Sequence, residues 1–166
     1  MKLKKIKNGF LSVGNVNKMG YTTEFKGQFD LDKKLDKKTY DLLMGLSKTR
    51  RMGRNVDKKF GVEGEFYFKD DGDYGQTRED NIIDYNTPPI TQPSLWLQWR
   101  PTKDKLHIEW DEGEKFYDYV EWIVYIIENI LKPKGYILNG SVKWRGEEFG
   151  DLGTIKIKNN VVTTTK

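Results

Sequence analysis

The sequence contains no cysteine and a single histidine, His107, which excludes several kinds of site at the outset. Without cysteine there is no disulfide, no thiol nucleophile and no thiolate metal ligand, and one imidazole cannot form a histidine cluster. Long apolar runs are missing too. The best candidate, FYDYVEWIVYIIENIL, is interrupted by Asp118, Glu121 and Glu128 and is shorter than the roughly 18 to 20 residues that span a bilayer. We therefore expect no zinc or cysteine chemistry and no membrane span.

Charge of both signs is abundant, with 29 Lys and Arg against 25 Asp and Glu and a formal net charge of +4. The local excess lies in MKLKKIK and KTRRMGR, which indicates a mild preference for anions and no nucleic-acid partner. The 36% hydrophobic and 13% aromatic content is typical of a globular protein, and 166 residues fit one domain. The basic N-terminus has neither an apolar signal core nor a cleavage site, so we expect a cytoplasmic protein, in a host cell if phage-encoded.

We expect residues 1–18 to be an N-terminal extension and residues 19–166 to be a single domain. The extension has small apolar residues punctuated by glycine and asparagine, without a sustained period. From Tyr21 to Leu31 apolar and polar residues alternate, which predicts a half-buried strand. Asp36 can cap a short helix that ends by Gly53, and EGEFYFK, residues 63–69, predicts a second strand.

The second half predicts a hairpin, a long helix and a meander. LWLQW, residues 95–99, and LHIEW, residues 106–110, would pair, and the buried face would carry Leu95, Leu97, Trp99, Leu106, Ile108 and Trp110. A helix is predicted from Glu114 to Leu131. Three strands then close the chain, the last two joined by a tight turn at Asn159 and Asn160. The fold class expected is α+β: one antiparallel β-sheet with two helices packed on one face.

Motifs for known chemistry are absent from the sequence. There is no phosphate loop, dinucleotide glycine fingerprint, HExxH or GxSxG, and no calcium-loop spacing. We therefore expect no metal, no cofactor and no catalytic residue. One enzymatic alternative stays open, a nucleotide hydrolase that would use His107, Glu109 and Asp111.

The stretch DYNTPPITQPSLWLQW, residues 84–99, contains three of the five prolines and two of the five tryptophans. Its prolines hold the chain extended, which would present Asn86 and Gln92 rigidly at the rim of a site. On the following strand Trp96, Gln98 and Arg100 would share one polar face, where a ring, an amide and a guanidinium can grip a flat anion. The other expected ligand-binding residues are Arg50 and Arg51, and His107 and Glu109 on the same face of the hairpin. A phosphate would be met by Arg100, Arg50 or Arg51.

Four segments, MGYTTEF, DYNTPPITQPSLW, EKFYDYVEW and GYILNGSVKWRGE, resemble the signatures of a family of small proteins encoded by phages, prophages and bacteria. The resemblance extends from Met19 to about Val162. It implies a phage setting and brings no activity or catalytic residue with it. By analogy, small accessory phage proteins often counter host defence.

Three functions are compatible with these observations. The leading hypothesis is a non-catalytic, counter-defence protein that binds and sequesters a nucleotide-like immune signal, with Trp96 stacking on the base. The first alternative is a protein-protein inhibitor of a host defence enzyme, which needs only an exposed sheet edge or aromatic surface. The hydrolase is the further alternative. A homo-oligomer is compatible with each.

Overall fold

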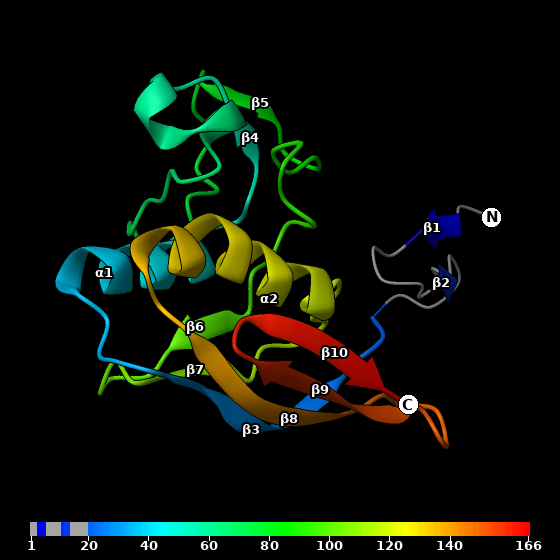
Figure 1. Cartoon of the computed structure of the whole chain (residues 1–166). Helices are drawn as coiled ribbons and strands as arrows, with labels where there is room; N and C mark the ends of the chain where they lie inside the picture. Colours follow the sequence, from blue (N-terminus) through cyan, green and yellow to red (C-terminus); the bar gives the residue numbers. More distant parts are fainter. Residues whose placement is uncertain (1–2, 6–10, 14–19) are drawn as a thin grey trace.

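The structure is a computed structural model that describes residues 3–5, 11–13 and 20–166. Its centre is a six-stranded sheet with the order β10-β9-β8-β3-β7-β6, in which every neighbouring pair is antiparallel. Its strands are β3 (Glu24–Leu31), β6 (Trp99–Pro101), β7 (His107–Trp110), β8 (Leu138–Arg145), β9 (Leu152–Lys158) and β10 (Val161–Thr165). The helices α1 (Lys37–Ser47) and α2 (Tyr119–Ile126) lie on the same face of this sheet (Figure 1). The predicted α+β architecture is confirmed.

The helix cap predicted at Asp36 and the tight turn predicted at Asn159 and Asn160 are both confirmed. The Asp36 carboxylate accepts a hydrogen bond of 2.8 Å from the backbone N–H of Thr39, which satisfies one of the free donors at the start of α1. Asn159 and Asn160 both have positive φ, 48° and 67°, which a two-residue turn between antiparallel strands requires. These two sites fix where a helix begins and how β9 and β10 are joined.

The core lies between the sheet and α2. Side chains of α2 are fully buried at Trp122, Ile123 and Ile126, and they belong to one hydrophobic cluster with Phe29 and Val142 of the sheet. Burying this much apolar surface on both layers is the main stabilising contribution to the fold. A cluster of aromatic rings, with Trp99 edge-on to Phe25, Phe29 and Phe116, extends the core under β6.

Several predicted boundaries were wrong. The segment expected to form a strand, residues 63–69, instead contains the short helix η2 (Val62–Gly64) and irregular chain, because its carbonyls bond to side chains from distant segments. The α1 helix ends at Ser47, well before Gly53. The strand of the first hairpin begins only at Trp99, and α2 begins at Tyr119 because the preceding residues are pinned as a loop by Gln98 and Phe116.

The remaining elements are short. A 3₁₀ turn, η1 (Lys58–Phe60), precedes η2, and β4 (Gly53–Arg54) pairs with β5 (Ile82–Asp84). After α2 the chain continues as η3 (Ile127–Leu131) and η4 (Lys132–Lys134). Most of the expected N-terminal extension lies outside the described residues; within it β1 (Leu3–Lys5) pairs with β2 (Leu11–Val13). None of the helices in the described part of the chain is both long and apolar enough to cross a membrane.

Candidate ligand-binding site

The structure distributes the residues expected to bind a ligand over four places. Arg50, Trp96 and Asn86 do meet. The Arg50 guanidinium lies 5.8 Å from the Trp96 ring centroid and donates a hydrogen bond of 3.3 Å to the Asn86 side chain. The edge of Tyr74 also packs on Trp96, with ring centroids 5.9 Å apart. This Trp96 cluster forms a half-buried aromatic and cationic surface in which the Arg50 guanidinium already has partners.

Arg51 and Gln92 lie inside the protein and so cannot present their polar groups at a surface. Arg51 is only 2% exposed, and its guanidinium donates to the carbonyls of Gly64 and Glu65 and to the side-chain oxygen of Gln92, at 3.2 to 3.3 Å. Burial lowers the pKa of Arg51 to about 10, and the neighbouring Arg54 adds to this effect. A buried guanidinium that donates to several carbonyls fastens loops together, so Arg51 has a structural role.

The face expected to carry Trp96, Gln98 and Arg100 is not formed. Gln98 is turned inward, where its amide donates to the carbonyl of Glu114 and accepts from the Trp110 ring nitrogen, at 2.7 and 3.2 Å. Of the positions expected to face inward, Leu97, Trp99 and Ile108 are fully buried, whereas Leu106 is 39% exposed, so the prediction is wrong at Leu106. Because Leu97, Gln98 and Trp99 are buried in succession, strict alternation does not hold before β6 begins.

Arg100, Glu109 and His107 lie on the sheet's outer face. Arg100 pairs with Glu109 at 3.4 Å, and His107 Nδ1 lies 2.8 Å from the Asp30 carboxylate. Asp111 directly follows β7, and burial raises the pKa of its carboxyl group. No group of three or more His, Cys, Asp or Glu side chains that could hold a metal ion occurs within residues 3–5, 11–13 and 20–166.

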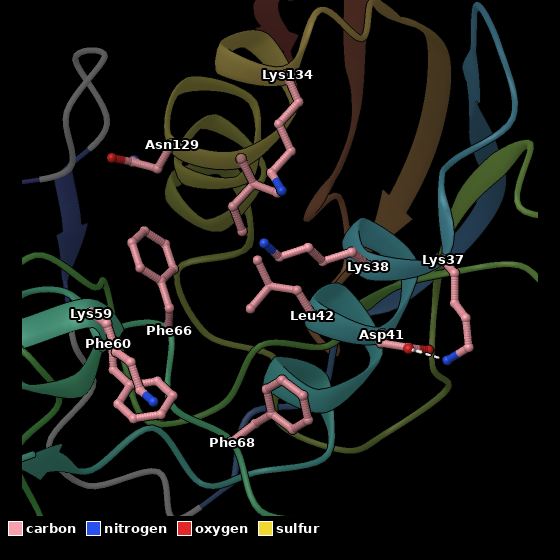
Figure 2. A pocket seen from close by; sticks show the side chains of 11 residues that line it. Lys37, Lys38, Asp41, Leu42, Lys59, Phe60, Phe66, Phe68, Asn129 and Lys134 are labelled. Carbon is pink, nitrogen blue, oxygen red and sulfur yellow. Dashed lines mark hydrogen bonds and ion pairs between the residues drawn. The ribbon is translucent and has the colours of Figure 1, made fainter. Parts of the chain in front are cut away.

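A cavity of about 650 Å³ opens between α1, the segment around η1 and η2, and the turns η3 and η4 that follow α2 (Figure 2). This size is within the range of small-molecule sites. Four lysines and three phenylalanines dominate its wall. The lining residues are Lys37, Lys38, Asp41, Leu42, Lys59, Phe60, Phe66, Phe68, Asn129, Ile130 and Lys134.

Two of the lysines are directed at the cavity. Figure 2 shows Lys38, from the first turn of α1, and Lys134, from η4, extending their amines toward the same space. Neither makes an ion pair with a described residue. Lys37 points away from them and pairs with Asp41 one turn along α1. Within the described residues Lys38, Lys59 and Lys134 have no ion-pair partner, and Lys59 lies over the Phe60 ring, whereas Lys37 is neutralised by Asp41.

The helical chain that follows α2 changes its winding where it lines the cavity. After α2 the chain forms the π-helical turn η3 and then the 3₁₀ turn η4, which ends at Gly135 in the left-handed conformation with φ 81°. Asn129 and Ile130 come from η3, and Lys134 comes from η4. Single π-helical turns inside helices are rare and frequently occur at functional sites, because they redirect side chains that regular winding would place elsewhere.

The aromatic wall of the cavity consists of Phe60, Phe66 and Phe68, and contacts with neighbouring elements hold it in place. Phe68 packs onto Gly45 of α1 so closely that a Cβ there would meet the ring at 2.2 Å. Lys59 lies 5.0 Å from the Phe60 ring centroid. Behind Phe66 the Glu65 carboxylate accepts a hydrogen bond of 2.6 Å from Tyr125, which ties this wall to α2. Burial, followed by the bond to Glu65, raises the pKa of that phenol.

Sequence reasoning missed this cavity. Its lysines come from positions 37, 38, 59 and 134, which no short motif unites, and Phe66 and Phe68 lie in a segment for which the sequence predicts a strand. The only local signals were the pairs of lysines in DKKT and DKKF and the KPK turn, and such pairs usually mark a solvated surface.

Comparisons with known proteins add no identification: no protein-family model, no curated protein and no solved structure matches this chain.

Proposed function

We propose that this protein binds a nucleotide-like ligand in the Lys38–Lys134 cavity and retains it without chemical change. The observation that carries the proposal is that ammonium groups without ion-pair partners and phenyl rings line the same cavity. Ammonium groups attract phosphate oxygens, and aromatic rings stack on the flat face of a base. The ligand class that needs both is an anionic group attached to a planar ring.

Non-catalytic binding is favoured by what lines the cavity. The lining residues include no imidazole, and the one carboxylate among them, Asp41, is paired with Lys37. His107 and Glu109, on which a hydrolase would depend, lie on the sheet's outer face, where each already has a partner. The resemblance to phage-encoded proteins suggests the biological setting, in which the bound molecule is an immune nucleotide signal of the host and binding removes it from circulation.

A thermal-shift panel of mono-, di- and cyclic nucleotides tests binding. A ligand present at 100 times its dissociation constant should stabilise the protein by about 2.7 kcal/mol. Lys38→Gln and Lys134→Gln should each weaken binding by about 1.5 to 3 kcal/mol, because each removes a charge-assisted hydrogen bond. Lys37→Gln is the matched control, since this neighbouring amine points away and is already paired.

Equal losses in all three variants would contradict a role for the directed lysines. Absence of a shift with every nucleotide would contradict the proposed ligand class. The bound nucleotide should be recovered unaltered by chromatography after a long incubation; an altered product would favour the hydrolase instead.

A second candidate, inhibition of a host defence enzyme by direct contact, is favoured by an exposed apolar surface. Val62, Ile83 and Ile90 are 50%, 59% and 82% exposed, and the backbone of Ile90 is held against η2 through a bond to the Glu63 carboxylate. Exposed apolar side chains held on a firm loop are typical of protein interfaces. Ile90→Glu should abolish protection of a phage in a plaque assay if this surface acts, and it should leave nucleotide binding unchanged.

A further inference from the structure

The outer face of the six-stranded sheet gathers lysines that are far apart in the sequence. Lys26 of β3, Lys143 of β8 and Lys156 of β9 are all exposed, and they alternate with buried residues that point to the helices. These strands are neighbours in the sheet. The three lysines, the lysine row, therefore project from one surface on the side away from α1 and α2.

The strand register places these side chains next to one another. Lys26 lies directly opposite Lys143. Lys143 is opposite Thr154, and Lys156 is two residues further along β9, which makes it the diagonal neighbour of Lys143. Directly opposed Cβ atoms in such sheets are about 4.5 to 5.5 Å apart, and like charges at that separation destabilise the sheet.

No ion pair among the described residues offsets this repulsion. None of the three amines makes an ion pair or hydrogen bond with a residue in the described part of the chain. Two more cations flank the row, Arg145 on β8 and Lys158 on β9. Of the acids on these strands, Glu24 is opposite Arg145, and Asp30 lies at the far end beside His107. Glu24 is also the diagonal neighbour of Lys143, so the surface has one acid at the edge of the row and a net positive charge from its lysines and Arg145.

We propose that the lysine row binds the phosphate backbone of a nucleic-acid duplex, independently of sequence. Regularly spaced phosphates complement several adjacent cations, and exposed hydroxyls on the same face, at Ser141 and Thr163, can donate further hydrogen bonds to phosphate oxygens. An unpaired strand fits less well, because binding of unpaired bases depends on aromatic side chains, and the described outer-face positions of these strands carry none. The even spread of charge along the chain concealed this surface, which forms only when β3, β8 and β9 pair.

Fluorescence anisotropy of a labelled 20-base-pair duplex, titrated with the full chain at 50 to 200 mM salt, tests the proposal. With about three phosphates contacted, the slope of log K against log salt should be about −2.7, so affinity should fall about 40-fold over this range. Lys143→Gln should reduce the slope by about 1 and the fall to about 12-fold. Lys58→Gln, an exposed lysine on η1, is the matched control and should change neither.

Several outcomes would overturn the proposal. These are no binding at 50 mM salt, the same change of slope in the Lys58 and Lys143 variants, equal affinity for polyglutamate, or tighter binding of an unpaired 20-nucleotide strand. Loss of folding does not confuse the result, because Lys143→Gln relieves the repulsion from Lys26 and should melt no lower than the parent. Lys38→Gln should leave duplex binding intact, which separates this surface from the nucleotide cavity.

Discussion

Replacing Arg51 by methionine should destabilise the protein by about 2 to 5 kcal/mol. The side chain donates to Gly64, Glu65 and Gln92, and hydrogen bonds from a charged donor contribute about 1.5 to 3 kcal/mol each, or roughly 5 to 9 kcal/mol in all. Against this stands the desolvation of a fully buried guanidinium. Burial lowers the pKa of this guanidinium to about 10, and its Nη1 has no hydrogen-bond partner within the described residues, so the desolvation cost offsets part of the hydrogen bonding and leaves a net loss.

The free energy of unfolding from urea titrations measures this effect. Arg78→Met, at an exposed arginine of the same loop region, is the control and should change stability by less than about 0.5 kcal/mol. Arg51→Lys should also destabilise, because one ammonium cannot reproduce the planar fork that reaches three acceptors. An Arg51→Met protein as stable as the parent would refute the reasoning. It would mean that the cost of desolvating the guanidinium equals the stabilisation from its hydrogen bonds, as replacements of buried ion pairs by apolar residues sometimes show.

Three further predictions concern the core, the helix cap and the Trp96 cluster. Ile123→Ala should cost about 2 to 5 kcal/mol in urea unfolding, because this side chain is fully buried between α2 and the sheet; a cost near zero would contradict that packing. The bond from Thr39 N–H, then that from the Tyr136 hydroxyl, lowers the pKa of Asp36 from 3.8 to about 2. The charged cap should therefore stabilise fully above pH 4 and lose its effect as the pH falls toward 2. Asp36→Asn should remove that part of the acid dependence, whereas an unchanged profile would show that the cap does not titrate this way. Trp96→Ala should leave nucleotide affinity unchanged, because this ring does not line the cavity; a loss of about 1 to 3 kcal/mol in titration calorimetry would move the site to Trp96, Arg50 and Asn86.

The elements that local chemistry specifies were predictable from the sequence. Alternation from Tyr21 to Leu31 gave β3, the Asp36 carboxylate gave the start of α1, and the asparagine pair gave the last turn. Each depends on residues within a few positions of one another, so the sequence contains the whole signal. The same holds for the fold class, because the order and amphipathic character of these segments leave few ways to cover one sheet face.

The candidate sites could not be predicted in this way, because they depend on contacts between distant segments. Sequence alone does not show whether an arginine is buried: Arg50 stays near the surface while Arg51, its neighbour, is enclosed by Gln92 and the carbonyls of residues 64 and 65. The sequence around Phe66 predicts a strand. In the structure, contacts with distant residues hold this segment as irregular chain, which forms one wall of the cavity. The lysine row likewise requires strand pairing to bring position 26 beside position 143. The sequence by itself determined β3, the start of α1, the last turn and the fold class. Only the tertiary structure decided which charges are buried, which are neutralised and which are left together facing a partner, because burial and proximity are properties of the packed chain.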